Sequence, residues 1–384
     1  VLSGVLDSRD TTLMRAGLTT LGAAFGDLPD GRLAVHPAVA VQGGGEIDCG
    51  LAGTVMRFLP PMAALASEPT RFFGDPHASV RPMAPLLGAL ASLGAAVSTP
   101  YQLPFTVASG TFRGGSVAVD ASGSSQFISA LLLAGARNAD GIEVRHTGAT
   151  LPSLPHIEMT CQLLERRGVA VTRPDASTWR VAPGPIAALD EAVEPDLTNA
   201  ATLLAAALVT GGELTTSWPD GVQATSELAD VLAAFGATLS YTGAGADRTI
   251  TVAAGFGLRG ADVDLAAISE FTPAAAALAA LAPGPSRIRG VAHIRGHETD
   301  RLAALATELG RLGADVRQTA DGLGFTPAAL HGGSFATYAD HRMAHAGALV
   351  GLATPGVELD DITCTTKTLP DFPGLWARLI GREA

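Results

Sequence analysis

Four basic side chains lie at or just before segments in which the sequence predicts a helix start: Arg81, Arg301, Arg342 and Lys367. A cation in this place opposes the partial positive charge of a helix N-terminus, which costs from a few tenths of a kcal/mol to about 1 kcal/mol. Lys367 is also the only lysine of the chain. A functional site that needs a compact ammonium group would explain why a lysine is present at this position. The alternative is that a lysine was retained by chance at the surface. The four cations together indicate an anion-binding site, and phosphate and carboxylate are the groups that arginine binds bidentately.

Two carboxylates near the same expected helix starts are candidates for proton transfer, Glu270 and Glu298. For Glu298 the alternative is an ion pair with Arg301 or a helix cap. His297 and His341 are candidates for a cap or for the core. No metal is expected, because no His or Cys residues spaced i and i+4 accompany them. No glycine-rich loop has the spacing of a phosphate-binding or dinucleotide-binding loop.

Serine and threonine occupy further expected helix starts: Ser124, Ser125, Ser153, Thr198 and Thr272. Capping the helix is what such residues most often do. For the first two serines and the two threonines, capping remains the alternative to ligand binding. Helix N-termini attract anions, and equivalent helices of a repeat start on one side, so a ring of these starts is expected to form the site.

An internal repeat organises these residues. Six helix-like segments with apolar residues at i, i+3, i+4 and i+7 each end in a glycine suited to the left-handed position after a helix. Successive glycines lie about 70 residues apart, and they are Gly22, Gly94, Gly168, Gly236, Gly313 and Gly381. The stretches 170–181 and 238–252 that follow two of them are expected to form hairpins.

A second set of helices is apolar on all sides, which predicts that these helices are buried. Five are expected, starting near Gly53, Ser124, Thr198, Thr272 and Asp340. Each precedes its amphipathic partner by about 25–28 residues. The sixth would lie upstream of Val1, so the chain is expected to lack about half a repeat at its amino end. A Pro-rich acidic stretch at 183–195 separates three units from three, which predicts two domains, 1–191 and 192–384, with the site in the cleft between them.

Composition narrows the class of protein. The chain has 384 residues, of which 47% are hydrophobic and 16% charged, so it can bury large cores and is not disordered. Its apolar runs are shorter than the roughly 18–20 residues of a membrane span. A net charge of −12 without a basic stretch argues against nucleic acid or an anionic membrane as a partner. Three scattered cysteines fit a reducing compartment, and a cytoplasmic α/β protein is expected.

The residues at the helix starts resemble those of the 3-phosphoshikimate 1-carboxyvinyltransferase (EPSP synthase) family. The resemblance covers the whole chain in order and rests on these segments: Ala52-Gly53-Thr54 with Arg57, Arg81-Pro82, Ser124-Ser125-Gln126, His297-Glu298-Thr299-Asp300-Arg301, Asp340-His341-Arg342 and Thr366-Lys367-Thr368. The family fold is α/β, with two domains of three βαβαββ units around a pseudo-three-fold axis, an inside-out α/β barrel. Here the first repeat is expected to be incomplete at its amino end.

The resemblance implies transfer of the enolpyruvyl group of phosphoenolpyruvate (PEP) to the 5-hydroxyl of 3-phosphoshikimate, without a cofactor or metal. It implies that PEP is held by Gly53, Arg81, Gln126, Arg301, Arg342 and Lys367. It implies that 3-phosphoshikimate is held by Ser124, Ser125, Gln126, Ser153, Glu270 and His297. Glu270, Glu298 and Lys367 are the implied catalytic residues, with Glu270 accepting the hydroxyl proton and Glu298 donating a proton to PEP. A monomer, and inhibition by glyphosate in competition with PEP, are also implied.

Several features depart from the family pattern. Leu51 stands where an Asn is usual, and Phe58 where many members have Pro. The family segment Lys-Ser-x-x-x-Arg does not occur in the chain, and it belongs to the half repeat expected upstream. The chain as given is therefore expected to be impaired. The alternatives are a UDP-N-acetylglucosamine enolpyruvyl transferase, disfavoured because the loop before Arg81 has no Cys, and a non-catalytic anion-binding homologue.

Overall fold

The computed structural model describes residues 1–221 and 223–381, and the chain divides into two compact units, Val1–Val193 and Glu194–Ala384. The expected boundary, between 191 and 192, lies two residues earlier. The difference has a long-range cause, because β12 (Glu191–Ala192) pairs in parallel with β1 (Leu2–Ser3) at the other end of the first unit. This pairing keeps residues 191–193 with the first unit.

The first unit holds five α-helices among its described residues: α1 (Arg9–Thr20), α2 (Gly53–Ala63), α3 (Ala84–Ser92), α4 (Gln126–Gly135) and α5 (Leu154–Arg166). Its further strands are β2 (Ala24–Asp27), β3 (Leu33–His36), β4 (Glu46–Asp48), β5 (Thr70–Phe73), β6 (Ala96–Val97), β7 (Phe105–Ala108), β8 (Gly115–Val119), β9 (Ile142–His146), β10 (Val171–Asp175) and β11 (Thr178–Val181). They form three four-stranded sheets of one design, in which a parallel pair is extended by an antiparallel hairpin: β12-β1-β3-β2, β4-β5-β7-β6 and β8-β9-β11-β10. The recurrence is the repeat that the sequence predicts.

The second unit has six α-helices in its described part: α6 (Leu197–Thr210), α7 (Thr225–Ala234), α8 (Thr272–Leu281), α9 (Arg301–Arg311), α10 (His341–Ala353) and α11 (Phe372–Leu379). Its strands are β13 (Glu213–Ser217), β14 (Thr238–Thr242), β15 (Thr249–Ala253), β16 (Asp262–Asp264), β17 (Ser286–Arg289), β18 (Asp315–Gln318), β19 (Leu323–Thr326), β20 (Gly333–Phe335) and β21 (Val357–Leu359). The sheet β16-β17-β19-β18 repeats the design of the first unit, while β13-β15-β14 and β20-β21 contain parts of it. The expected hairpins are confirmed as β10–β11 and β14–β15.

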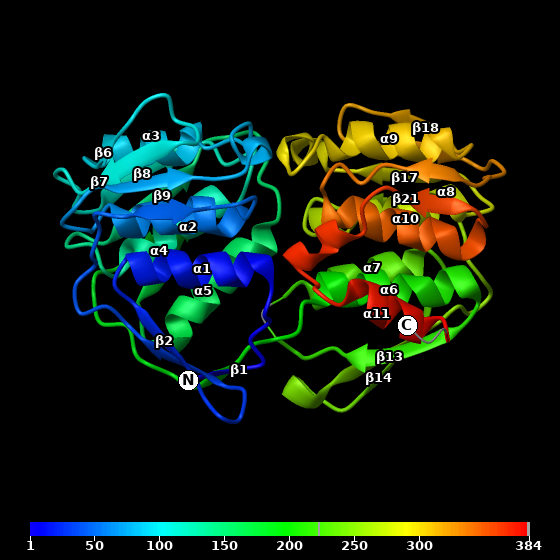
Figure 1. Cartoon of the computed structure of the whole chain (residues 1–384), viewed down its shortest axis with the longest axis horizontal. Helices are drawn as coiled ribbons and strands as arrows, with labels where there is room; N and C mark the ends of the chain where they lie inside the picture. Colours follow the sequence, from blue (N-terminus) through cyan, green and yellow to red (C-terminus); the bar gives the residue numbers. More distant parts are fainter. Residues whose placement is uncertain (222, 382–384) are drawn as a thin grey trace. The chain divides into compact units, whose positions relative to one another are not determined.

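The apolar helices form the centre of each unit, as predicted. In the second unit α6, α8 and α10 contact one another, and Figure 1 shows them side by side. All residues of α8 except Leu281 are buried. In the first unit α2 packs on α4. A fully buried Leu or Phe stabilises the fold by about 1.5–3 kcal/mol, so these helices supply much of the core energy and fix where their polar first residues lie.

The amphipathic helices end as the sequence predicts. α1, α3, α5, α7, α9 and α11 each end two positions before the expected glycine, and all six glycines have a positive φ, between 70° and 112°. Only glycine adopts this conformation without steric cost. The repeat is therefore encoded locally as well as by its hydrophobic pattern.

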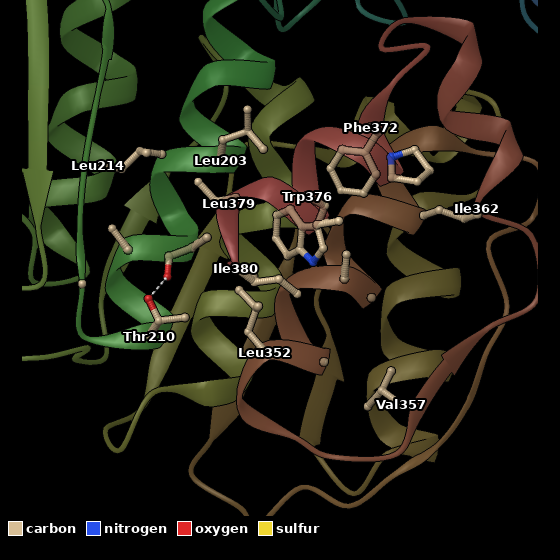
Figure 2. Close-up of a pocket in the computed structure, with 18 of the residues that line it drawn as sticks. Leu203, Thr210, Leu214, Leu352, Val357, Ile362, Phe372, Trp376, Leu379 and Ile380 are labelled. Carbon is tan, nitrogen blue, oxygen red and sulfur yellow. Dashed lines mark hydrogen bonds between the residues drawn. The ribbon is translucent and has the colours of Figure 1, made fainter. Parts of the chain in front are cut away.

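An apolar pocket of about 910 Å³ lies within the second unit, between α6, α10 and α11. Figure 2 shows Leu203 of α6, Leu352 of α10, and Phe372 and Trp376 of α11 on its walls. The polar residues that the sequence singles out do not line this pocket. The candidate site is therefore elsewhere.

Candidate active site

In the first unit, the start of α2 brings together Gly53, Arg81 and Gln126. A Cβ atom at Gly53 would lie 3.0 Å from Nη2 of Arg81 and 3.3 Å from Oε1 of Gln126. Only a glycine gives the guanidinium and the amide this close an approach to the helix N-terminus. Each of the three residues was predicted from a different sequence motif, and the fold places them in one location.

A second buried arginine, Arg57, binds Gln126 at this location. Nη1 of Arg57 donates to Oε1 of Gln126 at 2.8 Å, and its guanidinium lies over the ring of Phe127. Nη1 of Arg81 donates to the Leu51 carbonyl at 3.0 Å. Because both guanidiniums are buried next to helix N-termini, the location carries the positive charge that an anion requires.

The serines differ in what they do. Oγ of Ser124 accepts from the Gln126 amide at 3.3 Å and from Arg57 at 3.4 Å. Ser125 precedes α4 without a capping hydrogen bond. Ser153 precedes α5, also without one, and has a left-handed backbone with φ of 51°. A non-glycine residue in this conformation costs about 1–3 kcal/mol, and such residues cluster at functional sites.

Neither threonine caps a helix. Thr198 is the second residue of α6, whose cap is Asp196. Thr272 is the first residue of α8, and its buried hydroxyl has no hydrogen-bond partner. Capping therefore explains Ser124 in part, and it does not explain Ser125, Thr198 or Thr272.

In the second unit, Arg301 is the centre of a buried ionic network. Its Nε and Nη2 donate to the two oxygens of Asp340 at 2.7 and 3.1 Å. Nη1 donates to Glu270 at 2.7 Å and lies 3.0 Å from Nδ1 of His297, and Nη2 donates to Glu298 at 2.9 Å. The guanidinium is fully buried, and its five N–H groups face these partners. Sequence reasoning attributed the cost of this cation to an anionic ligand, but carboxylates of the chain itself offset it here.

The network shifts the titration of its members. Burial alone would lower the pKa of Arg301, but Asp340, Glu270 and Glu298 outweigh it and hold the pKa well above the ordinary value. Burial opposes ionisation of Glu270, whereas Arg301 and His297 favour it and hold its pKa well below the ordinary value. Glu270 is therefore a carboxylate at neutral pH.

Glu298 connects Arg301 to Lys367. The Lys367 ammonium donates to Oε1 of Glu298 at 2.6 Å, and the two side chains are 10% and 6% exposed. The ion pair that was the alternative reading of Glu298 is thus present. The helix cap is not, because Asp300 caps α9 by accepting from the Ala303 amide at 3.0 Å. Glu298 thus contacts two cations, Arg301 and Lys367.

Arg342, the second residue of α10, has a partner that sequence reasoning missed. Its Nη1 donates to Oδ1 of Asn199 at 2.7 Å, and its Nε lies 3.9 Å from Oε2 of Glu270. Its backbone amide donates to Asp340. A single buried asparagine on a helix made mostly of Ala and Leu is the signal that could have identified Asn199.

Two pairs of histidines lie near this network, His293 with His297 and His341 with His345. His297 lies 3.3 Å from Oε1 of Glu270 and 5.6 Å, between ring centroids, from His293. Burial lowers the pKa of His293 to about 4. His341 and His345 of α10 are buried, and burial lowers their pKa well below the ordinary value. The core alternative for His341 therefore holds.

The described part of the chain offers neither a group of metal ligands nor a helix that could span a membrane. Within residues 1–221 and 223–381, no three His, Cys, Asp or Glu side chains are grouped so that they could hold a metal ion. In the same part of the chain, every helix is too short or too polar to cross a bilayer.

Comparison with known proteins identifies the family of the chain. The family model described as EPSP synthase (3-phosphoshikimate 1-carboxyvinyltransferase) matches residues 1–376. The chain belongs to the EPSP synthase family. Proteins named 3-phosphoshikimate 1-carboxyvinyltransferase from Kocuria rhizophila and Mycobacterium ulcerans are 51% and 50% identical to it, over 98% and 99% of this chain and 87% and 88% of theirs.

Solved structures of the EPSP synthase family have the same fold. The EPSP synthase of Acinetobacter baumannii matches with a TM-score of 0.77 and 22% identity, over 98% of this chain and 88% of that one. The enolpyruvyl transferase NikO of Streptomyces tendae matches with a TM-score of 0.75 and 18% identity, over 98% and 88%. These findings confirm the α/β fold and the family resemblance. They also favour the EPSP synthase reading over the UDP-N-acetylglucosamine enolpyruvyl transferase.

The EPSP synthase motifs thus map onto two groups of side chains. Gly53, Arg81 and Gln126 lie together in the first unit, with Ser124 joined to them through Arg57. The second group lies in the second unit and comprises Glu270, His297, Glu298, Arg301, Arg342 and Lys367. Sequence reasoning assigned no role to Arg57, Asn199 or Asp340, each of which binds a predicted site residue.

Proposed function

We propose that the chain transfers the enolpyruvyl group of PEP to the 5-hydroxyl of 3-phosphoshikimate and releases phosphate, a step of the shikimate pathway toward chorismate and the aromatic amino acids. The observation that carries the proposal is that Glu298 binds both Arg301 and Lys367, next to Arg342. It is made in a chain about half of whose residues are identical to those of proteins named 3-phosphoshikimate 1-carboxyvinyltransferase. These side chains offer cations for an anionic substrate and a carboxylate for proton transfer in one buried place.

The proposal draws on both units for binding. PEP is held by Arg81, Gln126 and the backbone at Gly53, and by Arg301, Arg342 and Lys367. The phosphate of 3-phosphoshikimate is held by Ser124, Ser125 and Ser153, with Gln126 touching both substrates. Glu270 and His297 bind its ring hydroxyls. Arginine suits the phosphate and carboxylate of PEP because its donors match two oxygens at once.

The proposed reaction has two steps. The 5-hydroxyl oxygen bonds to C2 of PEP while its proton passes to Glu270, and C3 of PEP takes a proton from Glu298. In the second step C3 returns a proton to Glu298, the double bond re-forms, and the C2–O bond to phosphate breaks so that phosphate leaves. The intermediate is a tetrahedral anion, so Arg342 and Lys367, held in place beforehand, lower its energy electrostatically.

The ion pairs in the second unit suggest how the carboxylates become active. Glu270 and Glu298 are both engaged by Arg301, and Glu298 also by Lys367. PEP competes for the same cations. When it binds, Glu298 loses cationic partners and gains an anionic neighbour, which favours its protonated form. Substrate binding would thus convert a structural ion pair into a general acid.

Phosphate release from PEP plus 3-phosphoshikimate, measured on the full-length gene product, tests the proposal. Release should require both substrates and should give an enolpyruvyl product with the mass of 5-enolpyruvylshikimate 3-phosphate. Turnover with UDP-N-acetylglucosamine in place of 3-phosphoshikimate would support the related transferase instead. Binding of PEP without turnover of either acceptor would support the non-catalytic homologue.

The remaining features of the proposal follow from this chemistry. The substrates are small anions, so we infer no nucleic-acid or membrane partner. No cofactor is needed, because PEP itself carries the group that is transferred. We further infer a cytoplasmic monomer in which the two units act as domains that supply the two groups of side chains.

A further inference from the structure

The segment between β20 and α10 has an unusual backbone. Tyr338 and Ala339 are consecutive residues with φ of 57° and 54°. Residues other than glycine rarely adopt this left-handed conformation, and they keep it only where their surroundings determine it. The two residues directly precede Asp340, which binds Arg301 through both carboxylate oxygens. The conformation of this segment therefore sets the position of Asp340 and of Arg342 after it.

Two carboxylates from other elements hold the segment. Oε1 of Glu308, on α9, accepts from the Tyr338 hydroxyl at 2.7 Å, and Oε2 accepts from the Ala336 amide at 3.0 Å. Oδ1 of Asp360 accepts from the amide and the hydroxyl of Thr337 at 2.9 and 2.8 Å. Three successive residues are thus each tied to a carboxylate: the two before the left-handed pair and Tyr338, its first member.

Helix α9 forms hydrogen bonds with the segment at two points. Arg301 and Glu308 are seven residues apart, so they lie on one face of the helix, two turns and about 10 Å from each other. Arg301 binds Asp340, at the end of the segment, while Glu308 binds Ala336 and Tyr338 before it. One rigid helix thereby fixes both ends of the strained stretch.

A purely structural role explains Glu308 poorly. Its side chain has no exposed surface, although a helix position of this kind would be filled more cheaply by an apolar residue. Arg311, its ion-pair partner on the same helix, is 51% exposed, so an ion pair at the surface would not require the carboxylate to be buried. The hydrogen bond to Glu308 raises the pKa of Tyr338, as expected for a hydroxyl that donates to a carboxylate.

We propose that Glu308 and Tyr338 are positioning residues, which hold the segment 336–340 so that Asp340 orients Arg301, and so that Arg301 and Arg342 are placed to receive the anionic groups of PEP. The inference rests on the proposed function for the identity of the ligand. Neither residue touches the reacting atoms in this account. Their effect passes through Asp340, which orients Arg301, and through the amide of Arg342, which donates to Asp340.

Glu308→Gln and Tyr338→Phe test the inference in the full-length gene product. Each removes one of the contacts that hold the segment, and a hydrogen bond to a carboxylate corresponds to a change of about tenfold to hundredfold in an equilibrium. We expect KM for PEP to rise within this range and KM for 3-phosphoshikimate to change less. Arg311→Ala removes only the exposed ion pair, and Tyr241→Phe is a matched loss of an exposed hydroxyl elsewhere in the second unit. Both controls should leave the two KM values unchanged.

A rescue distinguishes positioning from general destabilisation. Ala339→Gly relieves the left-handed strain, since glycine adopts this φ freely. Added to Glu308→Gln, it should restore most of the affinity for PEP. Equal rises in both KM values without rescue, or an unchanged KM for PEP in folded Glu308→Gln and Tyr338→Phe, would overturn the inference.

Amide hydrogen exchange of residues 336–343 gives a readout that does not depend on turnover. Protection should fall in Glu308→Gln and stay unchanged in Arg311→Ala. If the wild type has no turnover, the proposed function is rejected, and the exchange measurement still decides whether Glu308 holds the segment. Unchanged protection in Glu308→Gln rejects the positioning role whatever the activity.

Discussion

Glu298 is the residue whose replacement best separates the proposed chemistry from simple charge pairing. Its carboxylate lies 2.6 Å from the Lys367 ammonium and 2.9 Å from Nη2 of Arg301, and the side chain is 6% exposed. Glu298→Gln keeps the shape and one acceptor oxygen, but it removes the charge and the proton that would be transferred. Two effects of different size should follow.

The first effect is on the rate. General acid catalysis contributes about 10²–10⁴-fold, so kcat should fall by that factor, or about 3–5 kcal/mol in activation free energy. The second effect is on stability. A hydrogen bond to a charged group contributes about 1.5–3 kcal/mol. The amide oxygen can still accept from one of the two cations, so the free energy of unfolding should fall by about one such contact.

Phosphate release at saturating substrates gives kcat, and thermal unfolding gives the change in stability. Asp300→Asn is the matched control on the same helix start. Asp300 accepts from the Ala303 amide at 3.0 Å, and Asn caps helices as well as Asp does, so kcat and stability should be nearly unchanged. A Glu298→Gln enzyme that keeps kcat within about threefold of wild type while KM for PEP rises would refute the reasoning and make Glu298 a binding residue.

Three further predictions concern the other groups. Gly53→Ala places a Cβ 3.0 Å from Nη2 of Arg81, so steady-state kinetics should show a raised KM for PEP, and an unchanged value would mean that Arg81 does not contact PEP from this position. Arg342→Ala and Lys367→Ala each remove a charge-assisted contact of about 1.5–3 kcal/mol, and calorimetry should show PEP binding weakened by about 10-fold to 100-fold; wild-type affinity in both would exclude these cations from the site. Burial lowers the pKa of His293 to about 4, below the unfolded value near 6.5. The unfolded chain therefore binds more protons between these values, and stability should fall as pH is lowered through this window. His293→Asn should flatten that part of the stability curve measured by denaturant unfolding, and an unchanged slope would assign it to other groups.

The fold could be predicted because its signals are local. One signal is the glycine after each amphipathic helix, and the other is that the central helices are apolar all around. Both are properties of short segments, and both recur with the same period. The domain boundary was displaced by two residues for the opposite reason. β12 belongs to the first unit through pairing with β1, and this contact joins residues 189 positions apart in the sequence. No local pattern reports such a pairing.

The residues of the candidate site could likewise be predicted only where their signal is local. Arg81, Arg342 and Lys367 were visible because a cation near a helix start is locally unfavourable and asks for an explanation. Their partners were not visible. Asn199 is 143 residues from Arg342, and Asp340 is 39 residues from Arg301. Sequence spacing shows where a charge stands, whereas only the folded chain shows what the charge faces.

Arg301 shows why that difference matters for function. A buried cation requires a compensating anion, and the sequence leaves open whether a substrate or the protein supplies it. Here the protein supplies Asp340, Glu270 and Glu298. The bidentate contact with Asp340 is fully buried, so it can keep Arg301 charged and oriented throughout. The contacts with Glu270 and Glu298 are the ones that an incoming anion can replace, because PEP competes for Arg301 and also for the other cations near these carboxylates, Arg342 and Lys367. The network therefore has one fixed partner and two exchangeable ones, and the exchangeable ones are the carboxylates to which proton transfer is assigned.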